Sequence, residues 1–235
     1  MSHQRSADGR TVVIVQPSYL PWLGYFAQMW RSDVFVIYDD VQYDKHGWRN
    51  RNRIKTPQGS QWLTVPVLHH GKGRPLISEV QIDNRQPWAR RHLQAISQNY
   101  SKAPYFADYV PRFTEVLARD WTHLVELDVA FLQTLCDMLG LRRDVIRAST
   151  LGIEGAGAGR LVDICRHLGA ARFFEGAAGQ DYIDSSLFTT AGITLEYQDY
   201  RHPVYPQLHG EFVSHLSVVD LLFNVGPQSL ETLAQ

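Results

Sequence analysis

The sequence has few cysteines and no long apolar run. Its 235 residues include two cysteines, Cys136 and Cys165, which are too few for a disulfide framework and lack the paired spacing of a structural zinc site. No apolar segment reaches the roughly 18 residues that a bilayer-spanning helix needs. The opening MSHQRSADGR also lacks the apolar core of a signal peptide. We therefore expect a cytoplasmic protein with a disordered start at residues 1–10 and no membrane partner.

The chain also lacks an excess of charge of either sign. Its 23 lysines and arginines nearly balance 24 aspartates and glutamates, for a formal net charge of −1. Proteins that coat nucleic acid are strongly basic overall, so we expect no nucleic-acid partner and only local charge effects. The ten histidines do not form the H-E-x-x-H spacing of a zinc enzyme, and no zinc site is predicted from them.

Apolar patterns predict an α/β fold with a mostly parallel sheet and flanking helices. Residues 11–16 and 34–38 are continuous apolar runs, typical of strands that are buried on both faces, and residues 26–31 between them fit a helix. This is a βαβ opening like that of Rossmann and nucleotidyl-transfer folds. Without a composition break, residues 11–235 are expected to form a single domain, with a helical layer at about residues 86–141.

The later elements are predicted from the same patterns. Further strands are expected at 62–67, 80–82, 145–148, 172–174 and 193–197, and further helices at 88–100, 105–118, 123–139, 161–168 and 215–223. In the helix at 161–168, Cys165 falls on the apolar stripe, so it is expected to be a buried packing residue. A cysteine nucleophile is correspondingly disfavoured.

Loops that leave the carboxyl ends of parallel strands form the ligand crevice of such a sheet. The first of these loops is rich in proline and aromatic residues, so we expect it to have a defined rather than a flexible conformation. Its candidate substrate-binding residues are Gln16, Tyr19, Trp22, Gly24 and Tyr25. We expect it to lie close to a second, cationic segment described next.

The cationic segment is KHGWRNRNRIK, residues 45–55. If it is extended, its cations project from one face, where guanidinium groups suit phosphate or carboxylate and neighbouring amides suit hydroxyls. The alternative is a solvated edge strand whose charges prevent aggregation. The candidate ligand residues here are Arg49, Asn50, Arg51, Asn52, Arg53 and Lys55.

Two carboxylates, Asp39 and Asp40, follow the predicted strand at 34–38. They are candidate catalytic residues, as a general base or as ligands of Mg²⁺ that bridges to a nucleotide, and helix caps or salt bridges are the alternative. His69 is a candidate proton shuttle, because histidine titrates near neutral pH.

Two later segments supply further candidates. The segment EGAAGQDY follows a strand, so its glycines can admit a ligand to the backbone, although a plain turn fits equally well. An aromatic and proline-rich block at residues 199–226 is a second ligand candidate. The substrate-binding residues predicted from the two segments are Gly176, Gly179, Asp181, Tyr182, Tyr205 and Gln207.

An ordered set of motifs resembles the WbqC-like protein family of bacteria. These motifs include QPSYLPWLGYF, WRNRNRIKT, GAARFFEGAAGQDYID and YPQLHGEFVSHLSVVDLLFNVG, and they span about residues 12–226. The resemblance implies a place in O-antigen, other surface-polysaccharide or specialised-metabolite biosynthesis. A more distant resemblance to nucleotidyl-transfer folds fails at their H-x-G-H signature, because residues 22–25 here are Trp-Leu-Gly-Tyr.

We therefore expect a transferase that moves an acyl or aminoacyl group with a nucleotide-linked or phosphate-bearing small-molecule substrate. One alternative is a nucleotidyltransferase that uses a nucleoside triphosphate and Mg²⁺. Another is a non-catalytic module that binds carbohydrate or a partner, with tryptophans stacking on sugar rings. The sequence is compatible with a homodimer.

Overall fold

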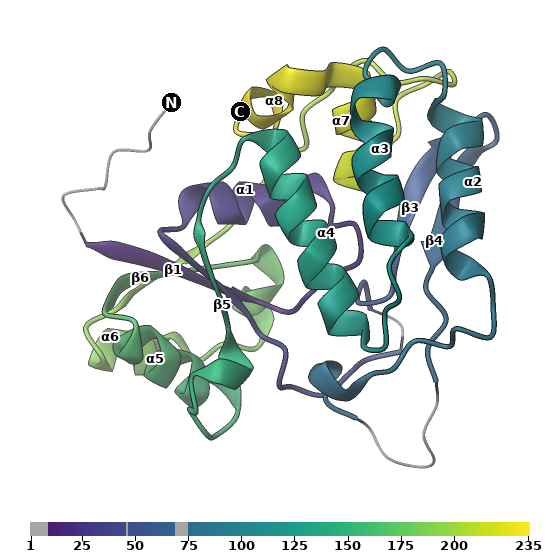
Figure 1. Ribbon diagram of the computed structural model, residues 1–235. Coiled ribbons are helices and arrows are strands. Elements are labelled where there is room, and N and C mark those ends of the chain that lie inside the picture. The colour runs from purple at the N-terminus through teal and green to yellow at the C-terminus, as the bar shows by residue number, and fades with distance from the viewer. Residues whose placement is uncertain (1–8, 46, 69–74) are drawn as a thin grey trace. The chain divides into compact units, whose positions relative to one another are not determined.

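A computed structural model describes residues 9–45, 47–68 and 75–235 (Figure 1). Close contacts divide the chain into two compact units. Unit 1 comprises Met1–Gln16, Ala27–Asp40 and Arg143–Arg201, and unit 2 comprises Pro17–Phe26, Val41–Arg142 and His202–Gln235. Helix α1 (Leu23–Arg31) contributes residues to both units.

Unit 1 is built on a five-stranded parallel sheet. Its order is β5-β2-β1-β6-β7. The strands are β1 (Arg10–Val15), β2 (Val34–Ile37), β5 (Asp144–Arg147), β6 (Ala170–Glu175) and β7 (Thr194–Tyr197). The βαβ opening and the α/β fold class predicted from the sequence are confirmed. The first strand begins at Arg10, and residues 1–8 of the predicted disordered start lie outside the described residues.

The strand order reverses direction at the centre of the sheet. From β1 the chain builds outward through β2 to β5, and it then returns to the other side of β1 with β6 and β7. This is the order of a doubly wound, Rossmann-type sheet, in which ligands bind beyond the carboxyl ends of the strands at the point of reversal. That point lies between β1 and β6.

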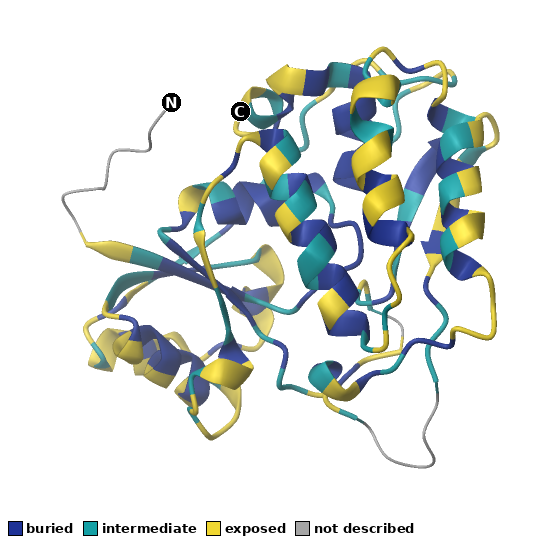
Figure 2. Cartoon of the chain, in the orientation of Figure 1, coloured by how far each residue is buried: buried dark blue, intermediate teal, exposed yellow. Residues whose placement is uncertain are grey.

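Both faces of this sheet are covered, which explains the continuous apolar strands. Val12 and Val34 belong to a core cluster shared with α5 (Gly157–His167) and α6 (Ser185–Thr190) (Figures 1 and 2). On β6, Phe173 stacks on Phe188 of α6 with ring centroids 5.1 Å apart. On the opposite face, the guanidinium of Arg31 lies 4.3 Å from the ring centroid of Phe174. The expected packing role of Cys165 is confirmed, since this side chain is fully buried.

Unit 2 combines helices with a two-stranded antiparallel hairpin. The helices are α2 (Trp88–Tyr100), α3 (Phe106–Leu117), α4 (Leu124–Leu139), α7 (Val218–Val225) and α8 (Ser229–Leu233), and the strands are β3 (Arg51–Thr56) and β4 (Gly59–Thr64). Helices α2 to α4 form the helical layer predicted for residues 86–141. Within the described ranges, no helix combines the length and apolarity needed to cross a bilayer.

An aromatic cluster holds three of these helices together. Phe113 of α3 lies 6.0 Å from Phe131 of α4 and 5.3 Å from Phe223 of α7, measured between ring centroids. The three rings are fully buried, and each such side chain stabilises the folded state by roughly 2–3 kcal/mol through burial.

Three predicted elements of unit 2 differ in the structure. The strand expected at 62–67 ends earlier, at Thr64, because residues 59–64 pair with β3. The strand expected at 80–82 forms only isolated bridges, including Val67 with Ile82. The last predicted helix begins at Val218 rather than at residue 215, because Ser217 caps it, accepting a hydrogen bond from Val219 N at 3.3 Å.

Candidate functional site

Polar side chains gather at the carboxyl edge of the unit 1 sheet. Gln16 follows β1, Asp39 and Asp40 follow β2, Glu175 ends β6 and Gln198 follows β7. Because all five strands are parallel, these positions share one edge of the sheet. The structure therefore places Gln16, Asp39, Asp40, Gly176 and Gly179 of the predicted site within the same unit.

The two aspartates after β2 are both engaged with cationic partners. Asp39 is fully buried and accepts hydrogen bonds from Arg147 Nε at 2.7 Å, Ser149 N at 3.0 Å and Ser149 Oγ at 2.8 Å. Asp40 pairs with Arg160 Nη2 at 2.5 Å. Arg160 Nε also donates to Ile153 O at 2.9 Å. These bonds fix the carboxylates in place, and their catalytic role stays a prediction.

Glu175 is the titratable group at the reversal point of the sheet. Its Oε1 accepts a hydrogen bond from Gly176 N at 2.9 Å, and burial raises its pKa to about 7. A Cβ atom on Gly179 would lie 2.4 Å from Glu175 Cγ, so glycine is needed there for this side chain to fit. Sequence reasoning missed Glu175, although a carboxylate directly before a glycine-rich turn at a strand end was an available signal.

Glutamines extend this polar cluster across the sheet edge. Gln28 Nε2, from α1, donates to Gln198 Oε1 at 2.9 Å, and Gln198 N donates to Glu175 O at 2.8 Å. A Cβ atom on Gly176 would lie 3.1 Å from Gln28 Nε2. The backbone of β6, the turn at Gly176 and the two amide side chains therefore form one connected polar wall beside Glu175.

Asp181 and Tyr182 end the short 3₁₀ turn that follows Gly176. Both are exposed, and Tyr182 has 70% of its surface accessible. Partial desolvation raises the pKa of Tyr182, and Glu175 and Tyr197 raise it further.

In unit 2, the proline-rich loop and the cationic segment lie against each other, as expected. Tyr19 N donates to Trp48 O at 3.1 Å, and Asn52 Nδ2 donates to Leu20 O at 2.8 Å. Asn52 is buried on the inner face of β3. This amide therefore fastens the loop to the strand, and it is the strand that positions the neighbouring arginines.

Gly24 serves the packing of Trp22 in this loop. A Cβ atom on Gly24 would lie 2.2 Å from the indole of Trp22, so only glycine leaves room for the ring. The indole stacks on the imidazole of His215 with centroids 5.3 Å apart. Arg53 Nη2 donates to His215 O at 3.2 Å, which connects the loop to the arginines of β3.

Trp48, Trp62, Arg51 and Arg53 form what we call the tryptophan–arginine surface. The indole centroids of Trp48 and Trp62 lie 5.3 Å apart. The guanidinium carbon of Arg51 lies 4.6 Å from the Trp62 centroid, and that of Arg53 lies 5.6 Å from it. Trp48 and Trp62 have 40% and 44% of their surfaces exposed. The exposed indole faces suit stacking on sugar rings and bases, and the neighbouring guanidinium groups suit contacts with phosphates.

Lys55 does not project with the arginines, contrary to the sequence-based expectation. It is 1% exposed, and its Nζ donates to Gln207 Oε1 at 3.0 Å and to Glu211 O at 2.5 Å. The reason is that the segment of residues 205–211 covers this end of β3. Gln207 Nε2 in turn donates to the buried Asp220 at 2.7 Å, and Tyr205 OH donates to the same carboxylate at 2.9 Å. Lys55, Tyr205 and Gln207 thus form an internal polar network.

Asp128 on α4 is a buried carboxylate of a different kind. It is 2% exposed, and neither of its oxygens has a hydrogen-bond partner among the described residues. Burial raises its pKa well above the ordinary range, against the opposing charge of Arg49. Tyr19 and Tyr25 are also buried, and Asp128 adds to the burial that raises the pKa of each.

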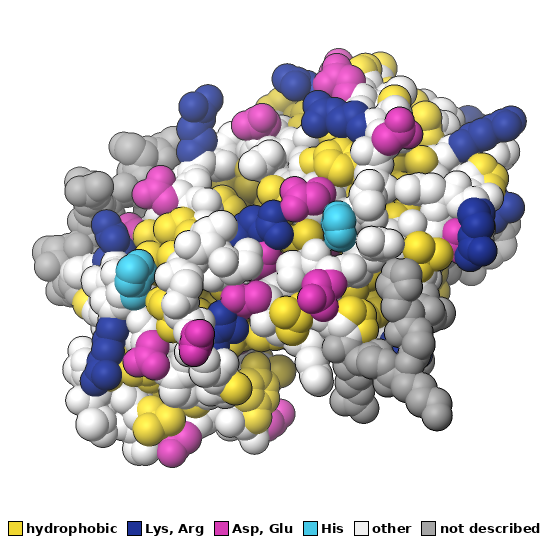
Figure 3. Space-filling model, turned by 60° about the horizontal axis from the view of Figure 1, so that its bottom comes forward, with side chains coloured by type: hydrophobic (Ala, Val, Ile, Leu, Met, Phe, Trp, Pro, Cys, Tyr) yellow, Lys and Arg dark blue, Asp and Glu magenta, His cyan; other side chains and the backbone are white. Residues whose placement is uncertain are grey.

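Arg49 lies before β3 and pairs with Asp44 at 3.5 Å. His69 lies outside the described residues. Within residues 9–45, 47–68 and 75–235, no three His, Cys, Asp or Glu side chains are arranged to hold a metal ion. On the face in Figure 3, acidic and basic side chains are interspersed.

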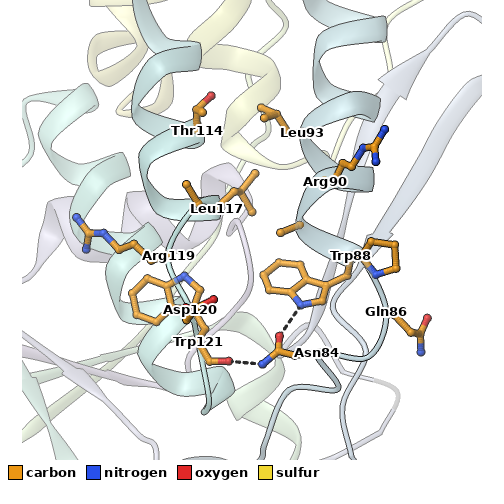
Figure 4. Close-up of a pocket in the computed structure, with 13 residues that line it drawn as sticks. Asn84, Gln86, Trp88, Arg90, Leu93, Thr114, Leu117, Arg119, Asp120 and Trp121 are labelled. Atoms are coloured by element: carbon orange, nitrogen blue, oxygen red, sulfur yellow. Dashed lines mark hydrogen bonds between the residues drawn. The ribbon is translucent and has the colours of Figure 1, made fainter.

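A pocket of about 440 Å³ lies between the start of α2 and the end of α3 (Figure 4). Trp88 Nε1 donates to Asn84 Oδ1 at 3.1 Å, and Asn84 Nδ2 donates to Trp121 O at 2.8 Å. These polar groups bond across the wall of the pocket and hold its shape. We place the candidate reaction centre at Glu175 instead.

Comparisons with known proteins agree with the family resemblance. The model of the WbqC-like protein family matches residues 16–232. A relative from Mycobacterium tuberculosis (strain ATCC 25618 / H37Rv), named "Uncharacterized protein Rv1507c", is 37% identical over 226 residues, covering 95% of this chain and 97% of the relative. None of the solved structures matches the chain significantly. The chain therefore belongs to the WbqC-like protein family.

Proposed function

We propose that the protein is a transferase that moves an acyl or aminoacyl group onto a nucleophile of a nucleotide-linked or phosphate-bearing substrate. The observation that carries the proposal is Glu175 at the reversal point of the parallel sheet, with a pKa of about 7. A general base is most effective when its pKa lies near the working pH. Family membership favours a role in surface-polysaccharide or specialised-metabolite biosynthesis.

Glu175 takes up the proton in this scheme. An amine or hydroxyl of the acceptor attacks the acyl carbon of an activated donor, the bond to the donor's leaving group breaks, and the acceptor's proton passes to Glu175 and then to the leaving group. The amide N–H of Gly176 holds the carboxylate in one orientation. Cys165 is not suited to carry the acyl group, because burial and Glu175 raise the pKa of its thiol to about 12.

The proposal is tested by incubating the protein with acyl thioesters and nucleotide-linked amino sugars and detecting acylated product by mass spectrometry. We expect product with the wild type and a loss of about 100-fold or more with Glu175→Gln, the magnitude typical of a removed general base. Glu115→Gln, on the exposed side of α3, is the matched control and keeps full activity. Equal activity of Glu175→Gln and wild type would refute the proposal.

A second candidate function, carbohydrate binding without catalysis, is favoured by the tryptophan–arginine surface. Exposed tryptophans stack on the apolar faces of sugar rings. Under this alternative, Trp62→Ala abolishes binding to a glycan array while Glu175→Gln leaves it unchanged. Product formation that depends on Glu175 would decide for the transferase.

A further inference from the structure

The tryptophan–arginine surface is held in place by the backbone around it. Arg53 and Trp62 are direct partners in the ladder of β3 and β4. The carbonyl of Trp48 accepts hydrogen bonds from Tyr19 N at 3.1 Å and from Ser18 Oγ at 3.0 Å. All of these residues belong to unit 2. The indoles and guanidinium groups are therefore positioned before a ligand arrives, which lowers the entropic cost of binding.

The aromatic part of this surface is within reach of a ligand. Trp48 and Trp62 keep 40% and 44% of their surfaces exposed, and their rings are tilted by 38° relative to each other. Strand alternation places Ser60 and Thr64 on the same face of β4 as Trp62, and both are exposed. Exposed indoles beside hydroxyl groups suit sugar rings, which have apolar faces and polar edges.

The same hairpin carries positive charge and no negative charge. Residues 51–64 include Arg51, Arg53 and Lys55 and no aspartate or glutamate. Lys55 is buried, so the two guanidinium groups supply the charge of the surface. A guanidinium group can form two parallel hydrogen bonds with a carboxylate.

The distances bring the two kinds of contact together. The guanidinium carbons of Arg51 and Arg53 lie 4.6 Å and 5.6 Å from the ring centroid of Trp62. An anion that either arginine binds therefore lies beside a ring that rests on the indole. A sugar with a carboxylate attached directly to its ring has this arrangement of groups.

A single-stranded nucleic acid fits the surface less well. Proteins that bind single strands combine stacking with a basic groove that follows several phosphates. Here two guanidinium groups supply the charge, and the formal net charge of the chain is −1. The observations therefore favour a sugar ligand over a nucleic acid.

We propose that the tryptophan–arginine surface binds an acidic oligosaccharide, with sugar rings stacked on the two indoles and ring carboxylates paired with Arg51 and Arg53. The inference rests on the carbohydrate-binding candidate of the proposed function and names its class of ligand. It assigns no ligand of the centre at Glu175 to unit 2, so binding and transfer are measured separately.

The test is isothermal titration calorimetry of the full chain at physiological salt with oligogalacturonate, a maltooligosaccharide of equal length, and polyphosphate. We expect oligogalacturonate to bind about tenfold or more tightly than either of the others. Trp62→Ala weakens its binding about tenfold, the loss expected for one stacking contact. Arg51→Gln and Arg53→Gln together lower its affinity to that of the maltooligosaccharide. Arg112→Gln, at an exposed position of α3, is the matched control without effect.

Three results would overturn the inference. They are equal affinity for oligogalacturonate and the maltooligosaccharide, equal affinity for oligogalacturonate and polyphosphate, and unchanged affinity in Trp62→Ala. Because Trp62 is exposed, its variant keeps the test valid even if the arginine variants fail to fold.

The failure of this inference is distinguishable from the failure of either proposed function. Equal binding of both oligosaccharides that depends on Trp62 would refute the acidic class and leave the carbohydrate-binding candidate standing. Binding of neither would refute both. Transfer that depends on Glu175 is measured without these ligands, so its presence or absence decides on the transferase alone.

Discussion

Asp39 in unit 1 and Asp128 in unit 2 are both almost completely buried, yet their surroundings are opposite. Asp39 accepts three hydrogen bonds from Arg147 and Ser149. Asp128 has no partner among the described residues, and burial raises its pKa. Burial penalises a carboxylate in both places, but of the two, within the described part of the chain, only Asp39 is compensated by hydrogen bonds. A buried aspartate in a sequence can therefore be assigned a structural or a functional role only when its hydrogen-bond partners are known.

The largest expected effect is the loss of the compensated carboxylate. Asp39→Ala leaves Arg147 without its buried partner, and breaking such a pair costs about 3–5 kcal/mol. Denaturant unfolding monitored by circular dichroism measures this loss in free energy of unfolding. Asp144→Ala, at the exposed start of β5, is the control and changes the free energy by less than about 0.5 kcal/mol. A small effect of Asp39→Ala would mean that these bonds do not hold the sheet edge.

Asp128→Asn should change the free energy of unfolding in the opposite direction from Asp39→Ala and by a smaller amount. The folded-state pKa of Asp128 is raised, so its contribution to stability is complete below the ordinary pKa of 3.8 and is lost as pH rises through the folded pKa. Removing the carboxyl group should therefore stabilise the protein at alkaline pH by about 1–3 kcal/mol.

The measurement is a series of unfolding curves from pH 4 to pH 9. Asp137→Asn, at an exposed position of the same helix, is the control and should follow the wild type. A destabilised Asp128→Asn at every pH would indicate that the carboxylate is charged and paired.

The smallest expected effect concerns a solvent-exposed carboxylate. Glu196 lies 3.7 Å from Arg31 and 3.3 Å from Arg172, with 38% of its side chain exposed. Exposed ion pairs contribute about 0–1 kcal/mol. Glu196→Gln should therefore shift the thermal midpoint only slightly, and less at high salt. A large shift would show that exposure is a poor guide to the strength of these pairs.

The sequence predicted the parallel sheet well because apolar runs and helical periods report burial directly. On β1, Val12 and Ile14 pack in a core cluster with residues of α5 and α6, and Val13, which points to the other face, is also fully buried. The partners of polar residues cannot be predicted from such local patterns, because they come from distant parts of the chain. Lys55 alternates with the arginines in the sequence, but residues 205–211 cover it. Gly24 is a predicted substrate-binding residue, but the indole of Trp22 fills the space beside it.

Titration of Glu175 by carboxyl-carbon NMR tests the central claim most directly, with Glu175→Gln used to assign the signal. We expect a midpoint near pH 7, so that the carboxylate can accept a proton at neutral pH and release it again. A midpoint near the ordinary value of 4.5 would contradict it, because Glu175 would then be a weak base at the edge of the sheet.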